Sequence, residues 1–235
     1  MMLNITDLKV RIGNLRIIRG VSLQVEEGEI VSLMGANGAG KTTLMRALSG
    51  IGHITGGKVE FMGQEITHSP SNKIVEAGLI QIPEGRQLFP LMSVKENLET
   101  GAHNPRAREK KAENLEYVYS IFPELREMSK KPAGNLSGGQ QQMVAIGRGI
   151  MAAPKLLILD EPSIGLSPIM TQRVMAAVQK INRDGVAVLI AEQNIQDVLK
   201  IASRAYVLEQ GQIRASGTAR EMLASDEIRA MYLGL

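Results

Sequence analysis

The stretch GANGAGKTT, residues 35–43, has the composition and spacing of a phosphate-binding loop. Its glycines let consecutive backbone N–H groups turn toward phosphate oxygens, and the helix expected after it offers a positive N-terminus. The lysine can reach the β- and γ-phosphates, and the hydroxyl after it can ligate Mg²⁺. The stretch predicts a nucleotide site whose contact residues are Gly35, Asn37, Gly38, Ala39, Gly40, Lys41, Thr42 and Thr43.

ATP is the nucleotide expected at this loop. The guanine-reading pattern Asn-Lys-X-Asp is missing, because Asn72 and Lys73 are followed by isoleucine and valine. A second glycine pattern, GRGIMA at residues 147–152, fits the dinucleotide fingerprint. It follows no strand, so we interpret it as helix packing instead.

Two adjacent carboxylates, Asp160 and Glu161, follow the apolar run LLIL at residues 156–159. Adjacent carboxylates alone are a weak signal, but ligands gather at strand ends in open α/β sheets. Together with a phosphate-binding loop, they predict a hydrolytic site. We expect Asp160 to hold Mg²⁺ through water, with Thr42 as a direct ligand, and Glu161 to take the proton of the attacking water.

Short, almost continuous apolar runs lead into these residues, at 29–34, 155–162 and 185–193. Such runs are typical of parallel strands that are buried on both faces. Helical spacing follows the first run, at Leu44, Ala47, Leu48 and Ile51, and separates the other two, at Met170, Val174, Ala177, Val178 and Ile181. The pattern predicts an α/β fold of the P-loop NTPase type with a parallel-sheet core.

Three parts are expected within one domain that spans residues 1–235. Residues 1–28 alternate apolar and polar residues, as half-buried antiparallel strands do. Residues 29–92 and 151–235 form the RecA-like core, and the helical pattern of residues 93–150 predicts a helical subdomain inserted into it. Within that insert the basic residues Arg106, Arg108, Lys110 and Lys111 are read as a solvated helix face, with contact to lipid headgroups or a membrane partner as the alternative.

The motif LSGGQ, residues 136–140, is a second potential anion site. The Ser137 hydroxyl, the amides of Gly138 and Gly139 and a helix N-terminus can all bind phosphate oxygens. A phosphate loop, this motif and a strand ending in Asp-Glu, in this order, resemble the nucleotide-binding domain of ATP-binding cassette (ABC) transporters along the whole chain. The resemblance implies that two such domains meet head to tail, with Ser137, Gly138, Gly139 and Gln140 of one closing over the ATP on the other.

Departures from the general family narrow the resemblance. Glu84 stands where that family has a glutamine, Gln193 replaces its switch histidine, and residues 163–167 read SIGLS. With QQMVAIGRG and the MYLG ending, these features resemble the smaller ATPase subunit of bacterial high-affinity branched-chain amino-acid importers. Urea importers are the alternative, although they are expected to keep the glutamine.

Comparison with the same family suggests roles for Gln193, Glu84 and Ile12. Gln193 is expected to position the γ-phosphate, because its amide donates a hydrogen bond but takes up no proton near neutral pH. Glu84 is expected either to contact metal or water or to form a salt bridge with Arg86. Ile12 occupies the place of the aromatic that stacks on adenine, so adenine is held more loosely or Arg11 or Arg16 stacks on it instead.

The resemblance also implies partners. These are transmembrane permease subunits, a second ABC ATPase subunit in a heteromeric pair, with a homodimer possible in isolation, and, indirectly, a periplasmic or extracellular substrate-binding protein. A groove for a permease coupling helix is expected along residues 84–97, lined by Leu88, Phe89, Leu91 and Met92. Burial of these four side chains in the chain's own core is the alternative.

Composition excludes several other classes of function. Net charge is +3 and aromatics are only 3% of residues, so nucleic acid is not an expected partner. The absence of cysteine and the wide separation of His53, His68 and His103 exclude a catalytic transition-metal site. Neither a signal peptide nor a membrane-spanning run is recognised, so the chain is expected in the cytoplasm. The resemblance to importer ATPases implies a peripheral position on the inner face of the cell membrane.

Two hypotheses of other classes stay open. A nucleotide-gated ABC clamp that works without transport would carry a long coiled-coil insertion or a second cassette, and neither is recognised here. A small-molecule P-loop kinase would leave LSGGQ without a role.

Overall fold

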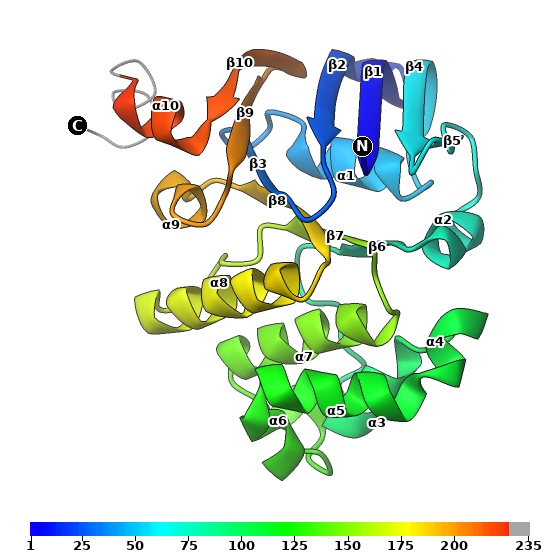
Figure 1. Ribbon diagram of the computed structural model, residues 1–235, viewed down its shortest axis with the longest axis vertical. Coiled ribbons are helices and arrows are strands. Elements are labelled where there is room, and N and C mark those ends of the chain that lie inside the picture. The colour runs from blue at the N-terminus through cyan, green and yellow to red at the C-terminus, as the bar shows by residue number, and fades with distance from the viewer. Residues whose placement is uncertain (226–235) are drawn as a thin grey trace.

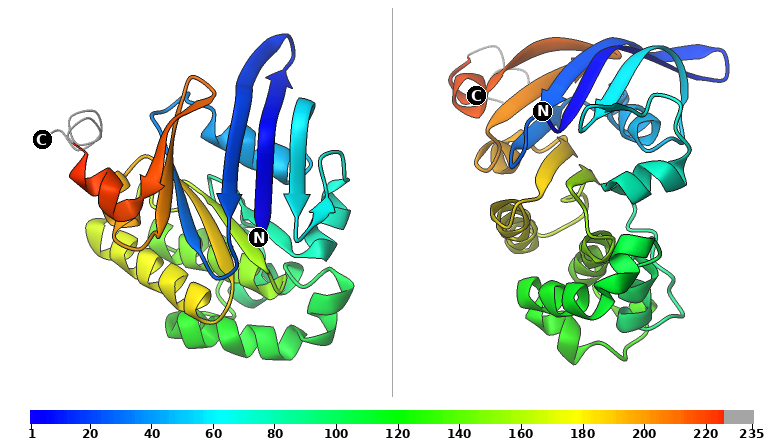
Figure 2. Two further views of the ribbon diagram at one scale, coloured as in Figure 1. Left: turned by 45° about the horizontal axis from the view of Figure 1, so that its top comes forward. Right: turned by 45° about the vertical axis from the view of Figure 1, so that its right-hand side comes forward.

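The computed structural model describes residues 1–225, so the MYLG ending at 231–234 lies outside the described part. Within residues 1–225 the strands form two sheets, of four strands in the order β2-β1-β4-β5 and of six in the order β10-β9-β3-β8-β7-β6. Figures 1 and 2 show the four-stranded sheet at one end of the molecule and a group of helices at the other. The predicted α/β fold, with its antiparallel and helical parts, is confirmed.

The four-stranded sheet is antiparallel and consists of β1 (Leu3–Ile12), β2 (Leu15–Val25), β4 (His53–Phe61) and β5 (Gln64–Glu65). The antiparallel sheet also includes β4 and β5, between residues 53 and 65, whereas the sequence predicted these residues in the RecA-like core. The alternation that marks a half-buried strand is interrupted in β4 by Gly56 and Gly57, beside a register shift against β1. Glycines at a bulge weaken the pattern from which such a strand is predicted.

The six-stranded sheet carries the predicted buried strands at its centre. Its members are β3 (Ile30–Met34), β6 (Leu79–Ile82), β7 (Leu156–Asp160), β8 (Ala187–Glu192), β9 (Arg204–Glu209) and β10 (Gln212–Thr218). Every residue of β3, β7 and β8 is buried, and these strands run parallel. Only β10 pairs in the antiparallel direction, at one edge.

Two hydrophobic clusters cover the opposite faces of this sheet. One joins Leu33 and Ile158 to the antiparallel sheet and to α1 (Lys41–Leu48). The other joins Leu159 and Ile190 to α7 (Gly138–Met151) and α8 (Pro168–Arg183). The remaining helices of the sheet part are α2 (Ser71–Ala77), α9 (Ile195–Leu199) and α10 (Ala219–Ala224). Ile51, expected on the face of α1, lies beyond its end and is 70% exposed.

Residues 93–150 are helical, as the sequence predicts. They form α3 (Val94–Thr100), α4 (Pro105–Glu109), α5 (Lys111–Ile121), α6 (Pro123–Glu127), a 3₁₀ turn (Ala133–Asn135) and α7. The GRGIMA pattern lies at the end of α7, where a Cβ on Gly147 would be 2.7 Å from Leu98 and one on Gly149 would be 2.8 Å from Ile82. The glycines therefore permit close packing of α7 against its neighbours, as the interpretation of this pattern as helix packing requires. Across residues 1–225, no helix is long and apolar enough to cross a membrane.

The basic residues of the insert are only partly a solvated face. Arg108 and Lys110 are exposed, whereas Arg106 donates a hydrogen bond of 2.7 Å to the Ala153 carbonyl and Lys111 pairs with Glu99 at 2.9 Å. Arg106 therefore caps the chain just after α7, where cations stabilise orphan carbonyls.

A bidentate ion pair between Arg204 of β9 and Glu29, just before β3, lies where the six-stranded sheet meets β2. The Arg204 guanidinium contacts both carboxylate oxygens of Glu29, at 2.6 and 2.8 Å, and also donates to the Gln24 carbonyl at the end of β2. Burial raises the pKa of Glu29, but the hydrogen bonds from Arg204 and from the Glu26 amide outweigh it and hold the pKa below its ordinary value of 4.5. The ionised form is therefore the one that the fold stabilises.

We expect Glu29→Gln to lower the free energy of unfolding by about 2 kcal/mol at pH 7. A carboxyl whose folded pKa is depressed stabilises the fold above its unfolded pKa and loses that contribution as the pH falls through the folded pKa. The difference from wild type should therefore shrink below about pH 4.5, as urea unfolding at pH 7 and pH 3.5 would measure. Glu209→Gln, which breaks an exposed pair with Arg214, is the matched control and should cost under about 1 kcal/mol. Equal losses in the two variants would contradict the assignment.

Candidate active site

Three neighbouring parallel strands end where the candidate residues lie. Strand β3 runs into the phosphate-binding loop, β7 ends at Asp160 and β8 ends at Glu192. The register pairs Met34 with Glu192 and Asp160 with Ala191. Because the carboxyl ends of parallel strands meet at one edge, the loop, the acidic pair and the segment that carries Gln193 are brought together.

The phosphate-binding loop is held in a compact form between β3 and α1. A Cβ on Gly35 would lie 2.4 Å from the Leu208 carbonyl, and Gly40 has a φ of +110°, so both positions require glycine. The Lys41 ammonium donates to the carbonyls of Gly35 and Ala36, at 2.6 and 3.3 Å. Beside the loop lies a cavity of about 450 Å³, lined by Ile17, Ala36, Asn37, Gly38, Gly40, Lys41, Thr42, Thr43, Glu84, Glu161 and Ile164.

Asp160 fits the role of a magnesium ligand. The Thr42 hydroxyl donates to Oδ1 at 3.2 Å, whereas Oδ2 is buried and has no hydrogen-bond partner. Burial raises the pKa of Asp160 to about 6, and the negative charges of Glu84 and Glu161 act in the same direction. A buried carboxylate oxygen without a partner beside a threonine hydroxyl is a suitable oxygen donor set for Mg²⁺, which otherwise takes phosphate and water ligands.

Glu161 lies against the phosphate-binding lysine. Its carboxylate forms a buried ion pair of 2.9 Å with Lys41 and also accepts a hydrogen bond of 3.2 Å from the backbone N–H of Gln193. The backbone of Glu161 has a φ of +50°, an uncommon conformation for a residue with a side chain. Backbone strain of this kind is concentrated at functional sites. The Gln193 side chain is exposed, at a neighbouring cavity that Glu161 also lines.

Glu84 lies at the same cavity but forms no ion pair with Arg86. The Arg86 guanidinium instead donates to the Gln141 side chain at 3.1 Å, on α7. Of the two roles expected for Glu84, the salt bridge is therefore wrong. Its exposed carboxylate faces the phosphate site, and its charge contributes to the raised pKa of Asp160.

Glu192, the last residue of β8, was not among the residues predicted from the sequence. Its carboxylate is 1% exposed and accepts hydrogen bonds from the amides of Ser163 (2.8 Å), Gln193 (3.2 Å) and Asn194 (3.4 Å). It thus joins the loop after Glu161 to the loop that carries Gln193. Burial raises the pKa of Glu192, and the amide hydrogen bonds oppose this effect. A carboxylate at the end of an apolar strand, the signal that revealed Asp160, was present here too.

We expect Glu192→Gln to lower the ATP turnover number about tenfold while the affinity for ATP changes little. A glutamine has one accepting oxygen, so its NH₂ group would face a backbone N–H and the two loops would separate. Steady-state hydrolysis over a range of ATP concentrations measures both quantities. Glu209→Gln, at the exposed end of β9, is the control and should match wild type. Unchanged turnover in Glu192→Gln would contradict this positioning role.

The LSGGQ residues lie outside the phosphate cavity of their own chain. Ser137 caps α7 in a capping box with Gln140, whose backbone N–H donates to the Ser137 hydroxyl at 3.4 Å. Ser137 is exposed and Gly138 half-buried, so the start of α7 is accessible. None of residues 136–140 lines the cavity beside Lys41, and α7 and α1 pack on opposite faces of the six-stranded sheet.

Ile12 also lies outside the lining of that cavity. It ends β1, is 58% exposed and pairs with Leu15 across the hairpin, whereas Ile17 is the residue of this ribbon that lines the cavity. Ile17 was not predicted, because it lies at a register shift of β2, between Arg16 and Ile18, where it has no partner on β1. The alternation of apolar and polar residues does not reveal such a shift.

Known proteins share this arrangement. The family model described as ABC transporter matches residues 18–164. The chain is 40% identical to the high-affinity branched-chain amino acid transport ATP-binding protein BraG of Pseudomonas aeruginosa, over 99% of this chain and 100% of that protein. It is 32% identical to the probable branched-chain amino acid transport ATP-binding protein LivF of Archaeoglobus fulgidus, over 100% and 99% of the two chains. The ADP conformation of an ATP-binding cassette of an ABC transporter superposes with a TM-score of 0.87 at 26% identity, over 100% of this chain and 99% of that one.

Proposed function

We propose, from the premise that this chain belongs to the ABC transporter family, that it is the ATP-hydrolysing subunit of an importer for branched-chain amino acids. The observation that carries the proposal is the 40% identity to BraG over nearly the whole of both chains. The departures at Glu84, Gln193 and residues 163–167 support the same substrate class. As a member of this family, the chain is an ATPase.

The ion pair between Lys41 and Glu161 gives the first step of the mechanism that we propose. A γ-phosphate entering the cavity competes for the Lys41 ammonium, which is the group that binds β- and γ-phosphates in such loops. Once Lys41 turns to the phosphate, the Glu161 carboxylate is released beside it. Glu161 then accepts a proton from the water that attacks the γ-phosphorus, and the products are ADP and inorganic phosphate.

Other residues of the chain hold the substrate in place. Amides of residues 38–43 and the N-terminus of α1 are positioned to bind the phosphate oxygens. Thr42 and Asp160 would hold Mg²⁺, which neutralises phosphate charge when bound. The backbone N–H of Gln193 donates a hydrogen bond that fixes the Glu161 carboxylate. The exposed side chain of Gln193 is then available to the γ-phosphate. For Glu84, which lines the same cavity, we propose the other expected role, contact with metal or water.

We also propose that two ATPase chains complete each site. The Ser137 hydroxyl and the exposed start of α7 lie away from the chain's own phosphate cavity, so a second chain must bring this surface to it. ATP then links two chains, and its hydrolysis removes the shared phosphate. The partner chain is expected to be a different ABC ATPase, in keeping with the family resemblance.

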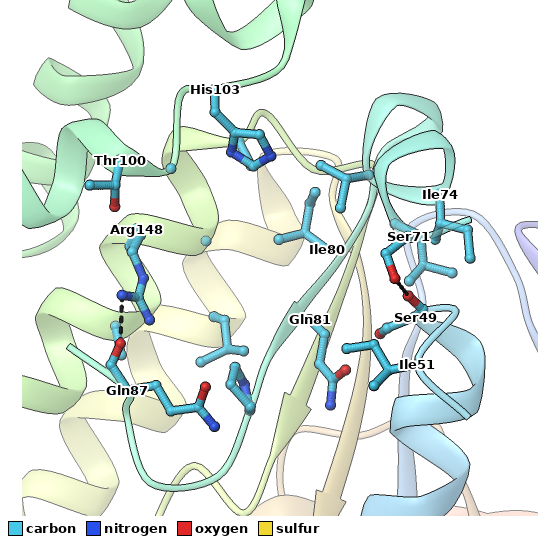
Figure 3. A pocket seen from close by; sticks show the side chains of 18 of the residues that line it. Ser49, Ile51, Ser71, Ile74, Ile80, Gln81, Gln87, Thr100, His103 and Arg148 are labelled. Atoms are coloured by element: carbon cyan, nitrogen blue, oxygen red, sulfur yellow. Dashed lines mark hydrogen bonds between the residues drawn. The ribbon is translucent and has the colours of Figure 1, made fainter. Parts of the chain in front are cut away.

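A groove between the sheet part and the helical insert is the proposed docking site for a permease segment. Its volume is about 580 Å³, and Figure 3 shows the apolar side chains of Ile51, Ile74 and Ile80 and the polar side chains of Gln81 and Arg148 around it. Of the four residues expected to line it, only Phe89 does. Leu88 packs against the core, Leu91 is 94% exposed, and Met92 lies outside the lining. Such a site at the inner face of the membrane suits an apolar helix of a partner.

Transport by the purified assembly tests the proposed function. The tagged chain is expected to co-purify with two membrane subunits and a second ATPase. In proteoliposomes with the substrate-binding protein, this assembly should take up labelled leucine, isoleucine and valine only when ATP is present. Uptake of urea in their place, or ATPase activity stimulated by nucleic acid and not by the membrane subunits, would overturn the proposal.

A further inference from the structure

We propose that a cluster of cations on the β1–β2 hairpin attracts the nucleotide to the phosphate cavity and sets the rate at which it associates. This cluster, the hairpin patch, consists of Lys9, Arg11, Arg16 and Arg19. The inference rests on the proposed nucleotide site. It adds to that site a role for these four side chains in the approach of the ligand, which is a polyanion, and not in contact with the bound ligand.

The strand register brings the four cations together in two successive rows. Lys9 lies opposite Arg19, and Arg11 lies opposite Arg16. Like charges that are directly opposite one another destabilise a pair of strands. Both rows therefore lower the stability of the hairpin, so the reason for this cluster lies outside the fold.

The hairpin patch is open to solvent and only partly neutralised. Val10 separates Lys9 from Arg11 on β1 and is fully buried, so these two cations project from the other face of the sheet. The two arginines of β2 are exposed. Lys9 pairs with Asp7 at 2.7 Å, whereas none of the three arginines forms an ion pair within residues 1–225. The patch therefore presents a net positive charge.

The chain's own groups at the phosphate cavity carry more negative than positive charge. Glu84 and Glu161 line the cavity, and Asp160 lies beside it, bonded to the Thr42 hydroxyl. Among the described residues that line it, Lys41 is the only cation, and it is already paired with Glu161. ATP and ADP are themselves polyanions, so these groups do not attract them from a distance. Long-range attraction has to come from other parts of the chain.

The hairpin patch lies next to this cavity. Arg16 directly precedes Ile17, which lines the cavity, and Arg19 follows two residues later. A Cβ on Gly40 of the phosphate-binding loop would be 3.5 Å from Ile17. Charges act over about 8 Å at physiological ionic strength, and further at lower salt. A cluster of one sign beside a cleft raises the local concentration of an oppositely charged ligand and thus its association rate.

Stopped-flow mixing of the full chain with Mg²⁺ and mant-ADP, which carries a fluorescent label on its ribose, tests the proposal without turnover. The association rate constant should fall about fivefold between about 20 mM and about 300 mM salt, with less than about a twofold change in the dissociation rate constant. An association rate constant that is independent of salt would overturn the inference and leave the proposed ATPase intact. Failure of mant-ADP to bind would overturn the nucleotide site itself, and this inference with it.

Charge reversal shows whether the hairpin patch is responsible. Arg16→Glu combined with Arg19→Glu should lower the association rate constant about fivefold at low salt and less than about twofold at high salt. Arg108→Glu combined with Lys110→Glu is the matched control. It makes the same change of net charge at two exposed positions at the end of α4, which lies at the other end of the molecule from the hairpin (Figure 1), and should stay within about twofold of wild type.

The hairpin variant is expected to remain folded, because each new glutamate lies opposite a cation and replaces a repulsive pair by an attractive one. Thermal unfolding checks this. Equal slowing of association in the control variant would show that total charge, and not the hairpin patch, is responsible. Faster dissociation with unchanged association would show that Arg16 or Arg19 contacts the bound nucleotide. Either result would overturn the inference.

Discussion

Replacement of Glu161 by glutamine is expected to lower ATP turnover roughly 10²- to 10⁴-fold while ATP still binds. Glutamine has nearly the same size as glutamate but cannot accept the proton of the attacking water. The substitution also removes the 2.9 Å ion pair with Lys41, which keeps its hydrogen bonds to the carbonyls of Gly35 and Ala36. Because Lys41 no longer has to leave a carboxylate, the affinity for ATP should rise, and the ATP-linked dimer should persist.

Three measurements distinguish this outcome from a general loss of structure. Steady-state phosphate release measures turnover, equilibrium titration measures ATP affinity, and size-exclusion chromatography with ATP measures the dimer. Lys41→Ala is the matched control, since it removes the other half of the ion pair and should lose binding and turnover together. Near wild-type turnover in Glu161→Gln would show that another group is the general base.

Replacement of Ser137 by alanine should lower turnover about 100-fold, because one preorganised donor to the reacting phosphate is lost. The substitution also removes the cap of α7, at a cost of about 1 kcal/mol, which is small enough for the chain to remain folded. The chain's own phosphate cavity is unchanged, since Ser137 does not line it. Binding of a first ATP should therefore be retained.

Mixing two inactive variants of this chain, in the homodimer that is possible in isolation, tests whether the serine acts on the other chain. A chain with Lys41→Ala keeps its LSGGQ surface, and one with Ser137→Ala keeps its phosphate cavity, so their mixed dimer contains one complete site. Hydrolysis by the mixture should clearly exceed the sum of the separate rates. Full ATP turnover by a monomeric chain with Ser137→Ala would contradict the shared site. It would also contradict the proposed role in transport, which depends on that site.

Patterns of adjacent residues were sufficient to predict the phosphate-binding loop, Asp160 with Glu161, the buried parallel strands and the helical insert. Each depends on interactions within a few residues of chain: consecutive amides, a carboxylate at a strand end, or apolar side chains at the period of one element. The start of α7 at LSGGQ also depends on neighbouring residues alone, since Ser137 and Gln140 cap the helix that begins there.

Contacts between distant parts of the chain decided which sheet some strands join and what the site residues contact. The pairing of β4 with β1 moved residues 53–65 into the antiparallel sheet, and the irregular register of β1 with β2 placed Ile17, and not Ile12, at the phosphate cavity. The ion pair of Lys41 with Glu161 and the hydrogen bond that Glu192 accepts from the Ser163 backbone N–H each join residues more than 25 positions apart in the sequence. A sequence fixes which side chains alternate along one strand, but strand pairing, bulges and the meeting of strand ends determine what each side chain faces.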